Sequence, residues 1–348
     1  MTSLIGWDVG GAHLKASRVV DGRTLDVAQW ACPLWQGLDH LSAALAQARK
    51  RWPMDAQTQH AVTMTGEMTD LFEHREAGVQ GIAALLAARL PGRLHFFAGE
   101  AGWSADAAAA WTQIASANWL ATARHAASEL DGEGVLVDIG STTTDLIAFR
   151  DGRLLTEARN DVQRLATGEL VYQGVVRTPL CALAARIGWR GQTLNVMNEF
   201  FATVADIYRL RGELDPAHDL YPPADNAGKD LPATRKRLAR MIGMDARDAT
   251  DDEWLAFAGE WRAAQVAELA GQLRRVVALH GLTPHKAVAV GAGCGDFLLG
   301  DLAAAAGLGG VRSYGRELAR AASSEVAAWA QVCAPSVAVA LLLDRELR

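Results

Sequence analysis

The chain has 348 residues with a formal net charge of −6, and 50% of its residues are hydrophobic. A chain of this length and composition can bury the cores of two packed domains. The net negative charge, without a long run of one sign, argues against a nucleic-acid-binding surface. The densest basic cluster, Arg235-Lys236-Arg237, is typical of a solvated helix face.

The predicted strand at the start of the chain and the absence of a bilayer-length apolar stretch predict a cytoplasmic protein with no membrane partner. The four cysteines have no paired spacing, which favours buried reduced thiols over disulfides or zinc. The sequence leaves the oligomeric state open, a homodimer included.

Hydrophobic periodicity predicts a sheet with helical crossovers in the first part of the chain. The predicted strands are 3–9, 16–20, 25–30, 60–65 and 93–98, and the predicted helices are 37–50, 76–90 and one or two over 105–128. A second strand meander opens at Val135 and continues to about residue 158, so the order of elements restarts there. This restart predicts a duplicated α/β unit.

Residues 195–275 are expected to be largely helical, with an exposed, turn-rich loop at 221–228 that can shape a substrate site. Helices are predicted at 316–331 and 335–346, the second of them buried. The predicted lobe I is 1–130, with the helix at 333–348 returning to it, and lobe II is 131–332, with its helical insertion at about 195–275.

Two acidic, glycine-rich turns lie about 130 residues apart, in segments 5–15 and 135–145. Each runs from an apolar strand through Asp and Gly into a second strand, as in a tight β-hairpin. Because glycine lacks a side chain, backbone amides in such a turn can approach a phosphate closely, and aspartate oxygens suit Mg²⁺. The candidate residues are Asp8, Gly10, Gly11, Asp138, Gly140, Ser141, Thr142 and Thr143.

A third segment, 287–298, runs from a strand through a glycine-rich turn into a helix, which again allows close approach to a nucleotide or diphosphate. Its candidate residues are Gly291, Ala292 and Gly293. The alternative for all three turns is purely structural: each aspartate caps nearby amides and each glycine permits a tight turn.

The three turns, in this order and spacing, resemble the phosphate 1, phosphate 2 and adenosine motifs of the actin, sugar kinase and heat-shock ATPase superfamily. The resemblance implies an α/β fold of two ribonuclease H-like lobes, the actin-like ATPase duplication, with an interlobe active-site cleft. Segments 157–160, 167–174 and 176–179 are similar to the hydantoinase/oxoprolinase branch of that superfamily.

More narrowly, segments 63–72, 116–119 and 198–208 resemble the tetrahydromethanopterin-linked C1-transfer pathway proteins, a group similar to the condensing enzyme of methanofuran biosynthesis. That resemblance implies a transferase that joins an (aminomethyl)furan-methyl diphosphate to the phenol of γ-glutamyltyramine or a tyrosine analogue. An aryl ether forms and pyrophosphate leaves. The glycine-rich turns would then hold the substrate's own diphosphate, and whether ATP binds is left open.

The resemblance also implies roles for individual residues. Asp8 and Asp138 would hold Mg²⁺, and the glycine turns with Lys15 would stabilise the leaving diphosphate. A carboxylate is needed to take the phenol proton, and Glu67 or Asp145 is the candidate base. The expected substrate-binding residues are Trp119, as a wall for an aromatic group, and Asp206.

The same residues have structural alternatives. Lys15 could face solvent from a strand, Glu67 could cap a helix, and Asp206 could point to solvent or to the core. Two other functions also stay open. An ATP-dependent small-molecule kinase or a hydantoinase/oxoprolinase-like amidohydrolase of the same fold would require ATP, and a non-catalytic nucleotide sensor or scaffold would bind without turnover.

Overall fold

A computed structural model describes residues 3–348, which form two compact units. Unit 1 contains the chain up to Gly132, together with Phe149–Leu155 and Arg312–Arg348. Unit 2 contains Glu133–Ala148 and Thr156–Val311. Unit 1 thus includes residues 131–132, 149–155 and 312–332, which the predicted boundaries had assigned to lobe II.

The sheet of unit 1 has the strand order β3-β2-β1-β4-β5-β6. Its strands are β1 (Ser3–Val9), β2 (His13–Val20), β3 (Arg23–Ala31), β4 (Gln59–Met64), β5 (Arg93–Phe97) and β6 (Trp103–Ser104). The first three strands are antiparallel because short turns join them, whereas β4 runs parallel to β1 and β5 runs parallel to β4.

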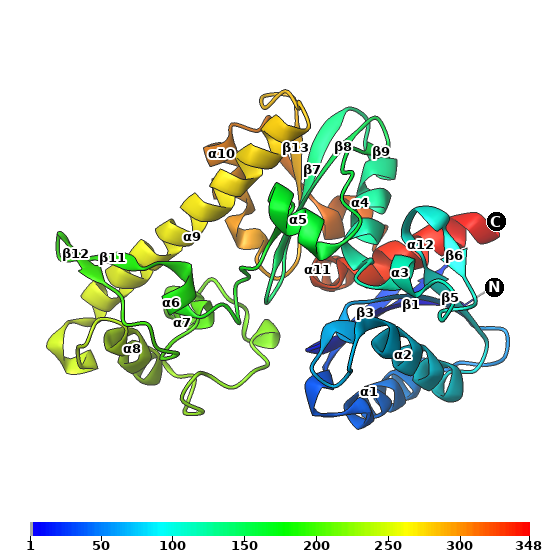
Figure 1. Ribbon diagram of the computed structural model, residues 1–348, viewed down its shortest axis with the longest axis horizontal. Helices are drawn as coiled ribbons and strands as arrows, with labels where there is room; N and C mark the ends of the chain where they lie inside the picture. Colours follow the sequence, from blue (N-terminus) through cyan, green and yellow to red (C-terminus); the bar gives the residue numbers. More distant parts are fainter. Residues whose placement is uncertain (1–2) are drawn as a thin grey trace. The chain divides into compact units, whose positions relative to one another are not determined.

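Helices cover both faces of this sheet (Figure 1). Alternate residues of β1, Ile5, Trp7 and Val9, are buried in a core that also takes side chains from α1 (Leu38–Arg51) and α2 (Arg75–Arg89). The opposite face carries α12 (Ala334–Leu347), which lies so close to β1 that a Cβ at Gly6 would be 1.9 Å from the Ser336 carbonyl oxygen.

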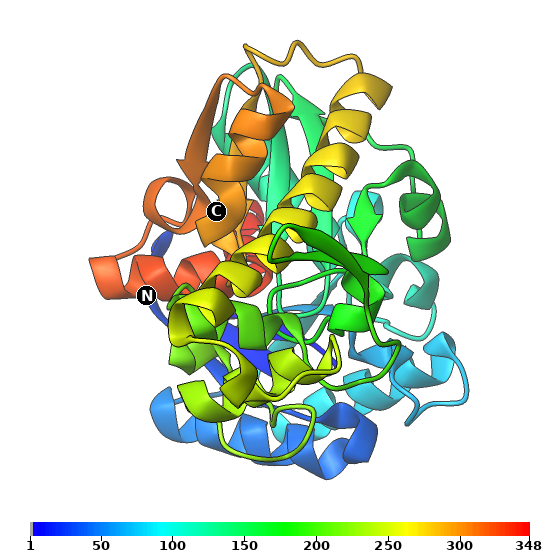
Figure 2. The same ribbon diagram turned by 90° about the vertical axis from the view of Figure 1, so that its left-hand side faces the viewer.

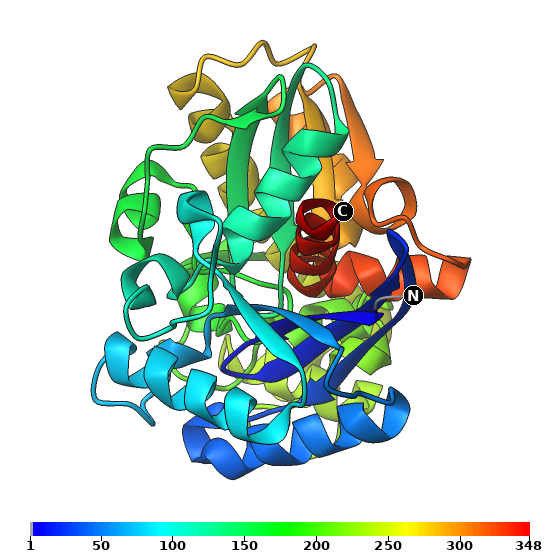
Figure 3. The ribbon, with the colours of Figure 1, turned by 90° about the vertical axis from the view of Figure 1, so that its right-hand side faces the viewer.

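The remaining helices of unit 1 are short, and α4 lies beside α12 (Figure 3). They are η1 (Leu34–Gln36), η2 (Gly66–Met68), η3 (Gly99–Ala101), α3 (Trp111–Ile114), α4 (Asn118–Glu129), η7 (Tyr314–Leu318) and α11 (Ser324–Val332). The predicted helix at 316–331 is wrong in its first half. A π-helical turn there ends at Leu318, and α11 begins only after the Ser323 N-cap, whose side chain accepts from Val326 N.

Among residues 3–348, no single helix has both the length and the apolar character needed to cross a membrane. Taken together, α11 and α12 pass that test by length and composition, but they meet at a bend of 105°. All four cysteines are free. Cys32 and Cys333 are buried, as predicted, but the prediction of burial is wrong for Cys181 and Cys294, which are partly exposed.

The second sheet has the order β10-β8-β7-β13-β14, with β9 paired to β8. Its strands are β7 (Glu133–Ile139), β8 (Thr144–Arg150), β9 (Arg153–Leu154), β10 (Leu170–Val171), β13 (Val288–Ala292) and β14 (Gly310–Ser313). It lies mainly in unit 2, but β9 and the last residues of β8 and β14 belong to unit 1. As β4 does beside β1, β13 runs parallel to β7. The repeated order confirms the predicted duplication of an α/β unit.

The predicted helical insertion is confirmed as largely helical, and its longest helix, α9, stands out in Figure 2. The helices of unit 2 are α5 (Asp161–Thr167), α6 (Leu180–Leu183), α7 (Val204–Arg211), η4 (Pro216–His218), α8 (Leu231–Arg240), η5 (Ala246–Asp248), α9 (Asp251–Leu279), η6 (Asp296–Leu298) and α10 (Leu299–Ala306). A hairpin that the sequence analysis missed, β11 (Arg186–Trp189) with β12 (Gln192–Asn195), packs on α9.

Candidate functional site

The turn between β7 and β8 in unit 2 is a tight turn that begins with glycine. Gly140 N donates to Thr143 O at 2.8 Å and closes the turn, and half-buried Asp138 lies near its start. Across residues 3–348, no acceptor receives a hydrogen bond from the backbone amides of Ser141, Thr142 and Thr143. Three such amides in one turn suit a phosphate.

The turn that follows β13 lies directly beside Asp138. The register pairs Ala292 with Asp138, and Gly295 N donates to Ile139 O at 2.9 Å. Gly293 has a φ of 84°, and a Cβ there would be 2.6 Å from Asp138 Oδ1 and 2.2 Å from Ile139 O. Backbone conformation and close approach therefore both require glycine at 293. The structure thus brings the predicted phosphate 2 and adenosine turns together.

A third segment, to which the sequence analysis gave no role, supports the first turn. Val175 N donates to Gly140 O at 3.0 Å, and Arg177 N donates to Ser141 O at 2.8 Å. Gly174 lies so close to the β7–β8 turn that a Cβ at this position would be 2.4 Å from Thr142 N. We call residues 138–143, 174–177 and 291–295 the glycine cradle.

Buried polar side chains fix the backbone of Gly174 through hydrogen bonds. Its carbonyl oxygen accepts from Gln265 Nε2 at 2.9 Å, and the Tyr208 hydroxyl donates to Gln265 Oε1 at 2.5 Å. Gly174 N donates to Thr178 Oγ1 at 2.9 Å. The sequence did offer a signal for this support, because Gly174 lies at the end of a segment, 167–174, that resembles the family. The sequence analysis gave no individual role to the residues of that segment.

Asp145 lies on β8, beyond the turn, and is ion-paired with Arg164 of α5. Arg164 also binds Asp161 at 2.7 Å. Burial raises the pKa of the Asp145 carboxyl, against the opposing effect of the Arg164 charge. Its role as a base stays a prediction.

The turn between β1 and β2 in unit 1 has the same construction. Gly10 N donates to His13 O at 2.9 Å, and Gly11 O accepts from Leu34 N at 2.9 Å. A Cβ at Gly11 would be 2.8 Å from Thr69 Cγ2, so little space is left there for a side chain. Asp8 is 4% exposed, near the end of β1. Both hairpins predicted from the acidic, glycine-rich segments are therefore present.

Asp8 shares its face of the sheet with Lys15 and Thr63, its register partners on β2 and β4. This is the face that α12 covers, because the residues on either side of Asp8 point to α1 and α2. Lys15 Nζ donates to Val332 O at 3.0 Å. Thr63 Oγ1 is buried and has no hydrogen-bond partner within residues 3–348. A phosphate-binding role for Lys15 stays a prediction.

Glu67 in η2 is a buried carboxylate, 1% exposed, held by side chains that the sequence analysis did not single out. Ser116 Oγ donates to Glu67 Oε1 at 2.7 Å, and Arg75 Nη2 donates to Ser116 Oγ at 2.8 Å. Arg75 Nε lies 3.9 Å from Glu67 Oε1. Ser116 has a φ of 51°, a conformation that non-glycine residues seldom adopt. The role of Glu67 as a base stays a prediction.

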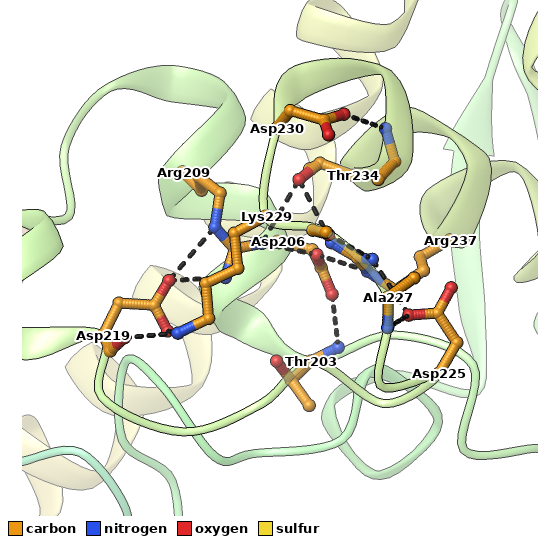
Figure 4. A network of polar contacts seen from close by, with 12 residues as sticks. Thr203, Asp206, Arg209, Asp219, Asp225, Ala227, Lys229, Asp230, Thr234 and Arg237 are labelled. Atoms are coloured by element: carbon orange, nitrogen blue, oxygen red, sulfur yellow. Dashed lines mark hydrogen bonds and ion pairs between the residues drawn. The ribbon is translucent and has the colours of Figure 1, made fainter.

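The two predicted substrate-binding residues are both buried. Trp119 in α4 is 4% exposed. Asp206 is fully buried in α7, where it accepts from Thr203 N in a capping box and binds Arg209 at 2.7 Å and Arg237 at 2.8 Å (Figure 4). Their contact with a substrate stays a prediction.

Within residues 3–348, no group of three or more His, Cys, Asp and Glu side chains is arranged to hold a metal ion. Mg²⁺ commonly binds through one or two carboxylates, with its other ligands from water and substrate phosphates. Asp138, whose Oδ1 faces the side-chain-free Gly293, fits that description. Asp8, in the matching turn of unit 1, offers the same kind of oxygen donor.

Comparison with known proteins identifies the family. The hydantoinase/oxoprolinase family model matches residues 58–334, most of the chain. The chain belongs to the hydantoinase/oxoprolinase family. The branch predicted from the motifs is thereby confirmed.

Two curated archaeal relatives of this family member carry one name, (4-(4-(2-(gamma-L-glutamylamino)ethyl)phenoxymethyl)furan-2-yl)methanamine synthase. The protein from Methanocaldococcus jannaschii is 31% identical over 259 residues, covering 74% of this chain and 76% of its own length. The protein from Methanococcus vannielii is 28% identical over 160 residues, covering 46% of this chain and 72% of its own. These names support an enzyme of the synthase type rather than a sensor or scaffold.

Among solved structures, a nucleotide-free acetone carboxylase aligns with a TM-score of 0.58 at 10% identity, covering 89% of this chain and 68% of that chain. This likeness concerns the fold alone. Together with the repeated strand order, it confirms the predicted α/β fold of two ribonuclease H-like units.

Proposed function

We propose that this family member condenses an (aminomethyl)furan-methyl diphosphate with the phenol of γ-glutamyltyramine or a tyrosine analogue. The products are an aryl ether and pyrophosphate. The observation that carries the proposal is the 31% identity, over 74% of the chain, to a synthase whose named product contains the phenoxymethyl-furan linkage. The glycine cradle supports it, because its geometry suits a diphosphate.

In this reaction the bond between the furfuryl carbon and the diphosphate oxygen breaks. Positive charge develops on the carbon, where the furan ring delocalises it, and negative charge develops on the leaving group. The amides of Ser141, Thr142 and Thr143 are available to donate hydrogen bonds to that charge. Donors fixed before the reaction stabilise developing charge without reorganisation, which is a large source of catalysis.

In unit 2, Asp138 is the residue that would hold Mg²⁺, and Asp8 is the equivalent candidate in unit 1. When bound, the ion would supply positive charge that offsets the charge of the diphosphate. Gly10 and Gly11 add no side chains to the turn that follows Asp8, and Gly140 adds none directly after the strand that carries Asp138. We assign diphosphate or Mg²⁺ as the ligand class of both turns.

The phenol must lose its proton as its oxygen bonds to the furfuryl carbon. An unperturbed phenol has a pKa of about 10, so a nearby carboxylate would assist the transfer. We propose Glu67 or Asp145 as the acceptor of that proton. Burial favours Asp145, because a raised pKa makes its carboxylate a stronger base. The Ser116 hydrogen bond favours Glu67, because it fixes the direction of the carboxylate.

The deciding experiment incubates the protein with Mg²⁺, the furan diphosphate and either γ-glutamyltyramine or tyrosine, with and without ATP. Phosphorus NMR follows pyrophosphate, and mass spectrometry follows the ether. We expect both products without ATP. The Asp138→Asn variant, which removes one proposed Mg²⁺ ligand, is expected to lose most of the turnover.

Two other outcomes would contradict the proposal, each in a distinct way. A product that requires ATP cleavage would indicate the kinase or amidohydrolase of the same fold. Binding of the diphosphate without turnover, for either acceptor, would indicate a non-catalytic protein. Turnover with one acceptor and not the other would support the reaction and identify the acceptor.

A further inference from the structure

We propose that Arg177 is an anion-binding residue of the glycine cradle and that Tyr221 holds its guanidinium in place. The inference rests on the proposed function, because it takes the ligand of the cradle to be a diphosphate. Neither residue was a candidate in the sequence analysis. Both lie in unit 2, as do all the residues that support them.

The backbone places Arg177 at the cradle. Arg177 N donates to Ser141 O at 2.8 Å, and Val176 N donates to the same oxygen at 3.1 Å. Ser141 is one of the residues whose own amide is available to a ligand. The side chain of Arg177 therefore starts next to the anion-binding turn, and it is exposed, so a ligand can reach it.

An aromatic ring limits where that side chain lies. The guanidinium carbon of Arg177 is 5.5 Å from the centre of the Tyr221 ring, within the range of a cation–π contact. Such a contact is made by the face of the guanidinium, whereas its N–H groups point outward from its edge. Arginine presents them as a planar fork that matches two phosphate oxygens.

Tyr221 can act as a fixed platform because its loop is anchored on both sides. Asp219, two residues before it, binds Arg209 at 2.6 Å and Lys229 at 3.0 Å (Figure 4). Asp225, four residues after it, binds Arg237 at 3.0 Å.

The centre of that network is buried. Arg237 is fully buried and also donates to Asp206 Oδ1 at 2.8 Å and to Gly228 O at 3.0 Å. Removing one member of such a buried ionic group is costly, so the loop is held in one conformation. Asp206, predicted as a substrate contact, therefore has a demonstrable place in the support of this loop.

The arrangement favours binding because the guanidinium is ordered before the ligand arrives. Immobilising a long, flexible side chain on binding weakens affinity, and a prior contact reduces that loss. A diphosphate carries more charge than the three backbone amides can match. An arginine beside these amides adds a positive charge, which favours a diphosphate over a neutral ligand.

The test is calorimetric titration of inorganic pyrophosphate with Mg²⁺ into the full-length protein and its variants. Arg177→Ala is expected to weaken pyrophosphate binding by about 10- to 100-fold, the usual range for a charge-assisted hydrogen bond. Arg177→Lys is expected to recover part of it. Tyr221→Leu is expected to weaken binding by about 2- to 5-fold, whereas Tyr221→Phe, which keeps the ring, is expected to bind as the wild type.

Arg190→Ala is the matched control. Arg190 is also exposed and lies over an aromatic ring, with its guanidinium carbon 4.9 Å from the centre of Trp189, but it is on the β11–β12 hairpin, outside the cradle. Its loss is expected to leave pyrophosphate affinity unchanged. The KM for the furan diphosphate should rise in Arg177→Ala by the same factor as the pyrophosphate dissociation constant.

The outcomes separate this inference from the proposed function. If the wild type makes the ether and binds pyrophosphate, but Arg177→Ala binds it equally well, this inference is overturned and the proposed function stands. If the wild type neither binds pyrophosphate nor makes the ether, both are overturned. Equal weakening by Arg190→Ala would show a general effect of surface charge and would also overturn the role of Arg177.

Discussion

Substituting Gly174 with alanine tests whether the close packing behind the cradle is needed for ligand binding. The new Cβ would lie 2.4 Å from Thr142 N and 2.5 Å from both Gly140 O and Ser141 C. These distances are about 1 Å shorter than an ordinary contact. All three atoms belong to the backbone, so no side chain can rotate away and the turn itself must shift.

We expect Gly174→Ala to lose about 1–3 kcal/mol of unfolding free energy, the usual cost of overpacking. We also expect Mg²⁺-pyrophosphate affinity to fall by about tenfold or more, because displacing preorganised donors weakens hydrogen bonds to the ligand. The control is Gly300→Ala in α10, where an added Cβ meets nothing within 4 Å. Helical alanine there should not destabilise the protein.

The assays are calorimetric titration of pyrophosphate and urea unfolding followed by circular dichroism. If Gly174→Ala matched Gly300→Ala in both, the packing of residue 174 against the turn would be refuted. A loss of stability with full pyrophosphate affinity would refute the assignment of the turn to the ligand, while leaving the packing intact.

Three further predictions concern single groups. His60 accepts from Trp7 in a buried contact, and burial lowers its pKa to about 4, so the neutral form is favoured in the fold. The contribution of His60 to the free energy of unfolding is fully present above about pH 6.5, the pKa of histidine in the unfolded chain. That contribution is lost as the pH falls toward 4. Urea unfolding should therefore show wild type losing about 2 kcal/mol more than His60→Gln between pH 7 and pH 5, and parallel curves would contradict this. Arg237→Met should cost about 3–5 kcal/mol by leaving buried carboxylates underpaired, and limited proteolysis should show faster cleavage at residues 219–229; unchanged cleavage would disprove the anchoring role. Glu67→Gln, if that carboxylate is the base, should lower kcat by about 100-fold or more with diphosphate affinity unchanged, whereas an unchanged kcat would move the role to Asp145.

Features that depend only on residues close together in the sequence could be predicted. Each hairpin turn depends on an aspartate, one or two glycines and flanking apolar residues, all within about ten positions, so segments such as 135–145 carry the full signal. The duplicated order of elements was equally visible along the chain. The sequence analysis did not predict that Gly293 lies beside Asp138, because this neighbourhood depends on the parallel pairing of β7 with β13.

Features that depend on distant partners could not be predicted. Asp206 was placed on a helix, but its burial is decided by Arg237, which comes from a different helix. The contact of Arg177 with Tyr221 likewise depends on how an irregular loop is anchored. Contacts of this kind join residues of separate elements and produce no periodic pattern in the sequence, so a single sequence does not predict them.

The missed hairpin had a local signal of an unusual kind. Arg190 and Gly191 have φ values of 46° and 75°, so both adopt the left-handed conformation of a two-residue turn between β11 and β12. Asn-Gly or Asp-Gly at these two positions would have predicted such a turn. An arginine in the first position is less favourable, and here it lies over Trp189 and pairs with Glu253 at 2.8 Å.

The way α12 closes unit 1 has a consequence for synthesis on the ribosome. The strands β1 to β5 emerge first, but one face of their sheet receives its cover from α12, which is translated long after them. This cover includes the Ser336 carbonyl, which accepts from Ser17 Oγ at 2.9 Å. The nascent sheet must therefore wait, with that face open, until α12 has left the ribosome. A premature stop before residue 334 removes one wall of the first domain's core rather than a dispensable tail.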